Sequence, residues 1–223
     1  MSLNSTISIT KTRTLESNKV LKNTYLLLSM TLLFSAATAG LAMLANMPPM
    51  NPIVTMIGYF GLLFLTTKFS NRALGLVFVF ALTGFMGLTL GPIISMYLKV
   101  FTNGHQLVMT ALGGTGVIFL GLSGYALTTK KDFSFIGGFL MVGILVAFLG
   151  SIGAMLFHIP MLSLAVSGMF ILLMSGMILY QTSEMIHGGE SNYILNTISL
   201  YISIYNLFLS LLQILGAFSG NRN

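Results

Sequence analysis

The residues of this chain that come nearest to known chemistry lie in the segment 184–190, Glu-Met-Ile-His-Gly-Gly-Glu. Glu184 and His187 are three residues apart, so on a helix they share one face. A Glu-x-x-His pair is typical of di-iron helical bundles, where it occurs twice and with further glutamates; this chain has one copy. The following glycines favour a helix end instead, with Glu184, His187 and Glu190 as solvated polar groups at an interface. We therefore expect no metal site here.

No other set of side chains predicts catalysis. The chain has no cysteine, which excludes disulfides, thiol nucleophiles and cysteine-ligated metals. It contains neither H-E-x-x-H nor G-x-S-x-G, the local patterns of zinc peptidases and of serine hydrolases. Only four acidic residues occur, and the apolar runs hold almost no ionisable groups that could act as an acid–base pair. The sequence therefore predicts a protein that is not an enzyme and that uses no cofactor.

The composition indicates a membrane protein. Of 223 residues, 55 % are hydrophobic and 6 % charged, and the mean hydropathy is +0.93. A soluble domain carries roughly 25 % charged residues, so this chain cannot cover a water-facing surface. Its apolar runs last about 20 residues, the length of a transmembrane helix. The net charge of +6 comes from scattered cations rather than a basic stripe, which argues against a nucleic-acid partner.

The apolar runs predict an all-α polytopic membrane protein with seven transmembrane helices. A polar tail, residues 1–23, precedes a membrane domain at 24–218 and a short tail at 219–223. Because the tail before Lys19 is rich in Ser, Thr and Asn, we expect it to be disordered. The predicted spans are 24–45, 52–67, 73–91, 107–128, 133–157, 161–186 and 193–218.

The cations predict the orientation of the seven spans. Eight of the ten Lys and Arg residues fall in segments on the same side as the N-terminus. Positive loops stay in the cytoplasm, so the N-terminus is expected inside and the C-terminus outside. The cations beside the membrane that mark this side are Lys19, Lys22, Lys68, Arg72, Lys130 and Lys131.

Small residues recur near the end of the third predicted span. Gly87 and Gly91 form a GxxxG pair, and Pro92 follows directly. Such pairs let membrane helices approach closely, either within one chain or between two. In a seven-helix bundle we favour packing within the chain over dimerisation, and we expect Pro92 to kink or extend the span. The sequence predicts no oligomeric state.

Four segments of this chain resemble the Bax-inhibitor (transmembrane Bax inhibitor motif) family. The similarity as a whole covers essentially the entire chain from Lys19 to Gly216. The resemblance implies seven helices with the last one central and packed by the other six. The segments are 83–94 with its Gly-Pro, 125–134 ending in Thr-Thr-Lys-Lys-Asp-Phe-Ser, 179–190, and 199–209 with Leu-Tyr-Ile-Ser-Ile-Tyr-Asn-Leu-Phe.

The resemblance also implies where an ion site would lie. Several members of the family are described as pH-sensitive calcium leaks that depend on two buried acidic residues in the sixth and seventh spans. At those positions this chain has Gln181 and Ser203, and Gln213 stands where a basic residue is common. Asn206 matches the asparagine of the family's motif in the seventh span. An amide and a hydroxyl do not titrate, but they can form hydrogen bonds between helices.

Within the family the chain looks most like a bacterial inner-membrane member. That closer resemblance implies a regulator of the membrane-bound protease FtsH, which it occupies as a poor substrate, with the protease's prohibitin-like accessory proteins as further partners. The polar tail would be the part that the protease grips. An ion leak channel is the alternative, weakened by Gln181 and Ser203, and a small-molecule transporter is a third.

Overall fold

The computed structural model describes the backbone of residues 3–220 and the side chains of residues 17–220. Seven of its helices are long and apolar enough to cross a membrane, as the sequence predicts. A single 3₁₀ turn, η1, precedes the fifth of them. The elements are α1 (Leu3–Leu44), α2 (Pro52–Phe69), α3 (Ala73–Val100), α4 (Gly104–Thr129), η1 (Ser134–Ile136), α5 (Gly137–Phe157), α6 (Pro160–His187) and α7 (Tyr193–Gly220).

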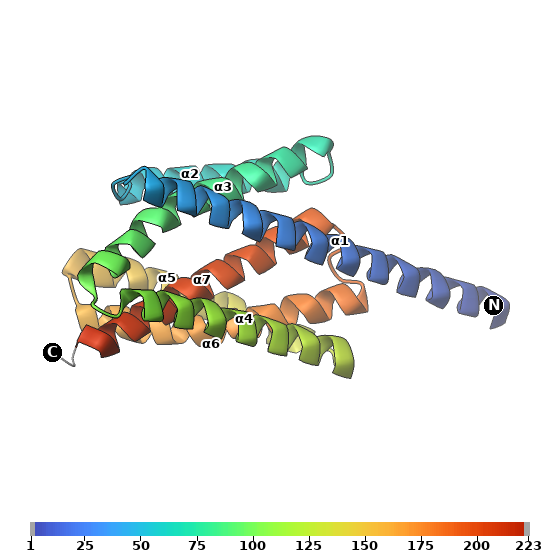
Figure 1. Ribbon diagram of the computed structural model, residues 1–223. Coiled ribbons are helices and arrows are strands. Elements are labelled where there is room, and N and C mark those ends of the chain that lie inside the picture. The colour runs from blue at the N-terminus through green and yellow to red at the C-terminus, as the bar shows by residue number, and fades with distance from the viewer. Residues whose placement is uncertain (1–2, 221–223) are drawn as a thin grey trace.

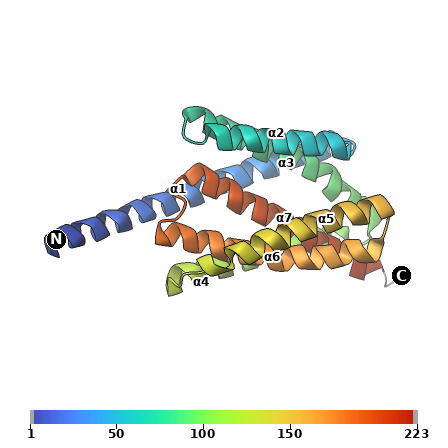
Figure 2. The same cartoon turned by 180° about the vertical axis from the view of Figure 1, so that it is seen from behind.

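The last helix lies inside the bundle, which confirms the expected architecture (Figures 1 and 2). Helices α1, α3, α4 and α6 pack around α7, whereas α2 packs on α3 and α5 packs on α6. The expectation that all six helices surround α7 is therefore wrong in this detail. In the apolar window of α7 44 % of the residues are buried, against 6 % in α2 and 17 % in α5. The two outer helices present apolar side chains that lipid can cover.

Proline and glycine have different effects on the helices according to their position. Helix α3 continues through the buried Pro92 to Val100, nine residues beyond the predicted end. A proline inside a membrane helix is tolerated where neighbouring helices cover the carbonyl that loses its partner. Pro160 opens α6 in the first turn, where its missing N–H costs nothing. Gly188 ends α6 with φ 77°, the left-handed conformation that the sequence predicts for this position.

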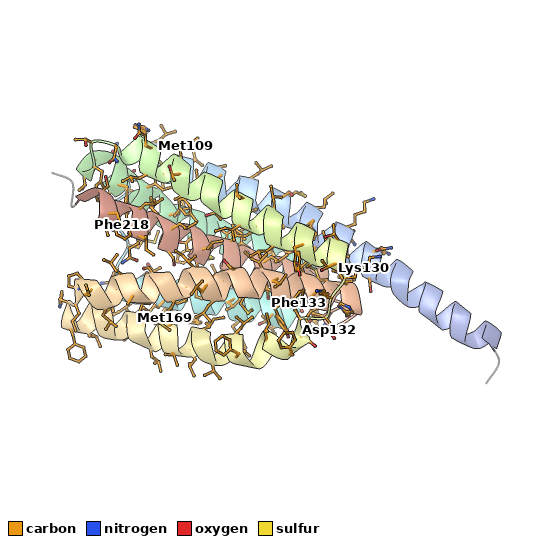
Figure 3. All side chains as sticks on the ribbon, turned by 90° about the horizontal axis from the view of Figure 1, so that it is seen from below. Met109, Lys130, Asp132, Phe133, Met169 and Phe218 are labelled. Atoms are coloured by element: carbon orange, nitrogen blue, oxygen red, sulfur yellow. The ribbon has the colours of Figure 1, made fainter. Side chains whose placement is uncertain are left out.

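The N-terminal tail is helical, so the prediction of disorder is wrong. Helix α1 begins at Leu3 and runs without a break through the first membrane span to Leu44. Extending an existing helix adds one hydrogen bond per residue without a new nucleation step, and this can outweigh a polar composition. In Figures 1 and 3 the first turns of α1 project beyond all other helices.

The glycines of α3 bring it against α1. A Cβ at Gly87 would collide with the Thr38 hydroxyl and the Ser35 carbonyl oxygen, and one at Gly91 would lie 2.6 Å from the Ala39 carbonyl oxygen. The GxxxG pair therefore packs within the chain, as the sequence analysis favours. The glycines of α4 differ, since a Cβ at Gly113, Gly116, Gly121 or Gly124 would meet nothing within 4 Å.

The cationic segments gather at one end of the bundle. Lys68 lies in the last turn of α2 and Arg72 directly before α3, and the loop between α4 and α5 carries Lys130 and Lys131. Both segments lie at the end from which the N-terminal turns project, as does the link between α6 and α7 (Figure 1). Lys130, Asp132 and Phe133 are visible there in Figure 3, far from Met109 and Phe218. We call this the N-terminal end.

Candidate functional site

Gln181 of α6 and Ser203 of α7 meet in the interior of the bundle. Both are buried, with exposed fractions of 6 % and 2 %. The Ser203 hydroxyl lies 3.5 Å from the Gln181 Oε1, at the outer limit of a hydrogen bond, and 2.9 Å from the carbonyl oxygen of Ser199. A hydroxyl has one proton, so the shorter bond to Ser199 is the stronger of the two. The structure thus brings together the two positions singled out by the family resemblance.

Helix α7 carries further polar groups that hold α1 and α3. Tyr201 is fully buried, and its hydroxyl lies 2.6 Å from the Ser35 hydroxyl of α1. The Tyr201 hydroxyl also donates to the Thr83 carbonyl oxygen of α3 at 3.3 Å. One turn earlier, Thr197 approaches the Thr24 carbonyl oxygen at 3.3 Å. Sequence reasoning missed Tyr201 as a link, although it belongs to the quoted motif of the last span.

Gln213 and Asn206 have different surroundings. Gln213 donates to the Ser163 hydroxyl at 2.5 Å and accepts from the Ser167 hydroxyl at 2.7 Å, both on α6. An amide with two serine partners therefore occupies the place of the family's common basic residue. Asn206 instead donates to the Ile202 carbonyl oxygen of its own helix at 2.9 Å.

These contacts define what the interior can do chemically. Polar groups inside a membrane protein need partners because lipid offers none. Among the described side chains, Thr24 Oγ1 is the one fully buried polar atom without a hydrogen-bond partner. The Gln181 amide and the Ser203 hydroxyl keep the same charge at every physiological pH. Their arrangement can join helices, but it cannot switch by releasing a proton.

A second polar site lies at the N-terminal end, where Ser183 and His187 hold the loop between α4 and α5. The Ser183 hydroxyl accepts from the Phe133 N–H at 2.9 Å and donates to the Lys131 carbonyl oxygen at 3.1 Å. His187 Nδ1 lies 2.9 Å from the Ser183 carbonyl oxygen, and Nε2 lies 3.1 Å from the Lys130 carbonyl oxygen. His187 is exposed, as expected of a polar group at the helix end, and it also contacts the α4–α5 loop.

The acidic residues of the 184–190 segment do not converge on a metal site. Glu190 Oε1 accepts from the backbone N–H of Asn192 at 2.7 Å, which shapes the turn into α7. No group of three His, Asp or Glu side chains in the described part of the chain could hold a metal ion. Asp132 shapes the neighbouring loop. The Ser134 backbone N–H donates a hydrogen bond to Asp132 Oδ1 at 2.8 Å. This bond stabilises the carboxylate and is the main reason that the pKa of Asp132 lies below its ordinary value.

Seven helices long and apolar enough to cross a membrane, with α7 in the interior of the bundle, define the class of this chain, and comparison with known proteins identifies the family. The family model described as "Inhibitor of apoptosis-promoting Bax1" matches residues 17–220. The chain belongs to this family. The resemblance inferred from the sequence motifs is thereby confirmed.

Named relatives cover nearly the whole chain. "Modulator of FtsH protease YccA" of Escherichia coli is 49 % identical over 206 residues, which are 92 % of this chain and 93 % of that protein. An uncharacterized protein of Pseudomonas aeruginosa is 52 % identical over 206 residues, 92 % of each chain. An uncharacterized membrane protein of Vibrio cholerae is 45 % identical over 210 residues, 94 % of each chain. A relative from another Escherichia coli strain, also 49 % identical over 206 residues, is named "Inner membrane protein YccA".

Proposed function

We propose that this protein is a non-enzymatic modulator of an FtsH-type membrane protease. The observation that carries the proposal is the 49 % identity, over nearly the full length, to a relative named a modulator of that protease. The prohibitin-like accessory proteins of the protease are further proposed partners. The bilayer surrounds the outer helices, whose exposed large apolar side chains include Phe64 of α2 and Phe139 of α5.

The structure supports a physical mechanism for this role. A processive protease needs a chain end that it can pull, and the first turns of α1 project beyond the other helices (Figure 1). An isolated helical segment of about 12 to 15 residues is marginally stable in water, so this extension can unwind at low cost. The protease would then meet the packed membrane domain. Extracting each span exposes roughly 20 apolar residues to water, so the chain is gripped but degraded slowly.

The orientation belongs to the same proposal. We place the N-terminal end, with its cationic loops, in the cytoplasm and the C-terminus outside. A C-terminal alkaline phosphatase fusion is then expected to be active, and a C-terminal green fluorescent protein fusion is expected to be dark. Fusions after Lys131 should give the opposite pair of results. A fluorescent C-terminal fusion would overturn the orientation and would also put the tail out of reach of a cytoplasmic protease.

Removal of the projecting tail tests the mechanism. Deleting residues 2–15 is expected to lengthen the half-life of the protein several-fold in cells that contain FtsH, because the protease loses its grip. Insertion should be unchanged, since Lys19 and Lys22 remain beside the first span. The measurement is a chase of full-length and shortened protein in cells with and without the protease.

A matched control shows whether the length of the tail or its particular sequence sets the half-life. A protein with residues 2–15 scrambled keeps the composition and is expected to decay like the natural protein. Equal half-lives of the full-length and shortened proteins in FtsH-containing cells would contradict the tail mechanism. Failure of FtsH to co-purify with the full-length protein from native membranes would contradict the proposed function itself.

A further inference from the structure

The two ring nitrogens of His187 both face carbonyl oxygens. Nδ1 lies 2.9 Å from the carbonyl oxygen of Ser183, in its own helix, and Nε2 lies 3.1 Å from that of Lys130, in the loop between α4 and α5. A carbonyl oxygen only accepts hydrogen bonds. A neutral imidazole has one N–H and can satisfy one of these oxygens, whereas the imidazolium has two and can satisfy both.

We propose that His187 is a pH-dependent latch that fastens the α4–α5 loop, Lys130–Phe133, to the C-terminal end of α6 when the imidazole is protonated. The latch closes as the pH falls, because the closed loop offers the second proton an acceptor that the open loop does not. Linkage requires the reverse as well, since closing the loop favours binding of the proton. The latch is a property of this chain alone and is independent of any protease partner.

Ser183 supplies the fixed half of the latch. Its buried hydroxyl accepts from the Phe133 N–H and donates to the Lys131 carbonyl oxygen, and none of these groups titrates, so we expect this contact to hold the loop whether or not the imidazole is protonated. His187 lies at the exposed edge of the same contact, where a proton from water can reach it. Protonation therefore changes the hold on Lys130 and leaves the anchor at Phe133 in place.

The surrounding charges have both signs. On the loop, the positive charges of Lys130 and Lys131 disfavour an imidazolium, whereas the negative charge of Asp132 favours it. On α6, the acidic Glu184 lies one turn before His187. Glu190 follows the helix, and α1 brings Lys22 to the same end. Helix α7 has no charged residue, and the one titratable imidazole of α4, His105, lies at its opposite end. Since Asp132 stays ionised over the range in which an imidazole titrates, its attraction for the imidazolium is constant.

The absence of cysteine allows a single spin label to report on the loop. A label on Lys131→Cys, whose native side chain is exposed, is attached to the full-length protein in lipid nanodiscs. The immobilised fraction of the label is expected to rise about threefold between about pH 8 and about pH 5, as one exposed charge-assisted hydrogen bond forms. His187→Gln, which cannot titrate, is expected to abolish the response, and His158→Gln is the matched control that keeps it.

Either of two spin-label results would overturn the latch. One is a label whose mobility does not change with pH, and the other is a response that persists in His187→Gln. Nitrogen-15 spectra of the unmodified protein provide a measurement without any substitution. At about pH 5 the Nε2–H of His187 is expected to exchange with water several-fold more slowly than the same group of His105 and His158. Equal exchange of all three would contradict the proposal.

Discussion

Replacing Gly87 by alanine is expected to lower the free energy of unfolding by about 2 to 3 kcal/mol, because the new methyl group has no room. It would meet the carbonyl oxygen of Ser35 and the hydroxyl of Thr38, and a carbonyl oxygen in a helix cannot move aside. Helices α1 and α3 would have to separate along their whole contact. For a chain of this size the midpoint of thermal unfolding should fall by about 4 to 12 °C.

Gly121→Ala is the matched control for this change. Gly121 is also a glycine inside a membrane helix, but a Cβ there would meet nothing within 4 Å. Alanine at this site is expected to leave the midpoint unchanged or to raise it slightly, since it restricts the unfolded chain. Thermal unfolding of both variants in the same detergent is the measurement. Equal effects of the two substitutions would show that the contact of α3 with α1 is looser than the structure has it.

The second large effect is expected from placing two carboxyl groups in the interior. In the double variant Gln181→Asp with Ser203→Asp, two acidic side chains would face each other where the natural polar atoms lie 3.5 Å apart. Two buried carboxylates at such a distance cannot both ionise, so the folded pair keeps a proton. The unfolded chain releases that proton above about pH 4. The folded state therefore binds more protons, and stability falls as the pH rises.

The comparison needs the natural protein and one neutral variant. The natural protein and Gln181→Asn with Ser203→Asn are expected to unfold at temperatures that do not depend on pH between about 5 and 8. The double aspartate variant is expected to lose stability steadily over this range. A flat profile for it would show that water reaches the pair and that the two positions are not enclosed by the bundle.

The same proteins test the alternative of an ion leak. Calcium flux through the natural protein in liposomes is expected to be small and flat between about pH 6 and 8, because Gln181 and Ser203 carry no titratable group. The double aspartate variant is expected to show a flux that depends on pH. A steep leak through the natural protein would contradict this and would favour the ion-channel function over the protease modulator.

The apolar runs of the sequence determine the seven membrane spans and the class of the protein. Crossing a bilayer needs about 20 apolar residues in a row, which is a local property that a window of sequence contains. The GxxxG spacing of Gly87 and Gly91 and the Gly188 helix end could be predicted for the same reason, since each is a pattern within a few residues, although the helix that the GxxxG pair meets is not part of that pattern. The pair Gln181 and Ser203 was found through the family resemblance, which aligns positions without showing their contact.

The tertiary structure decided which polar groups meet. Ser35 and Tyr201 are 166 residues apart, and the loop residue Phe133 is 50 residues from Ser183. Which partners such groups find depends on where whole helices cross, and the apolar periodicity of each helix is compatible with several crossings. The same holds for four glycines of α4, which look like those of α3 in sequence but face open space: Gly113, Gly116, Gly121 and Gly124. The tail shows the converse. Its polar composition predicts disorder, whereas the membrane part of α1 supplies the helix nucleus that the tail lacks.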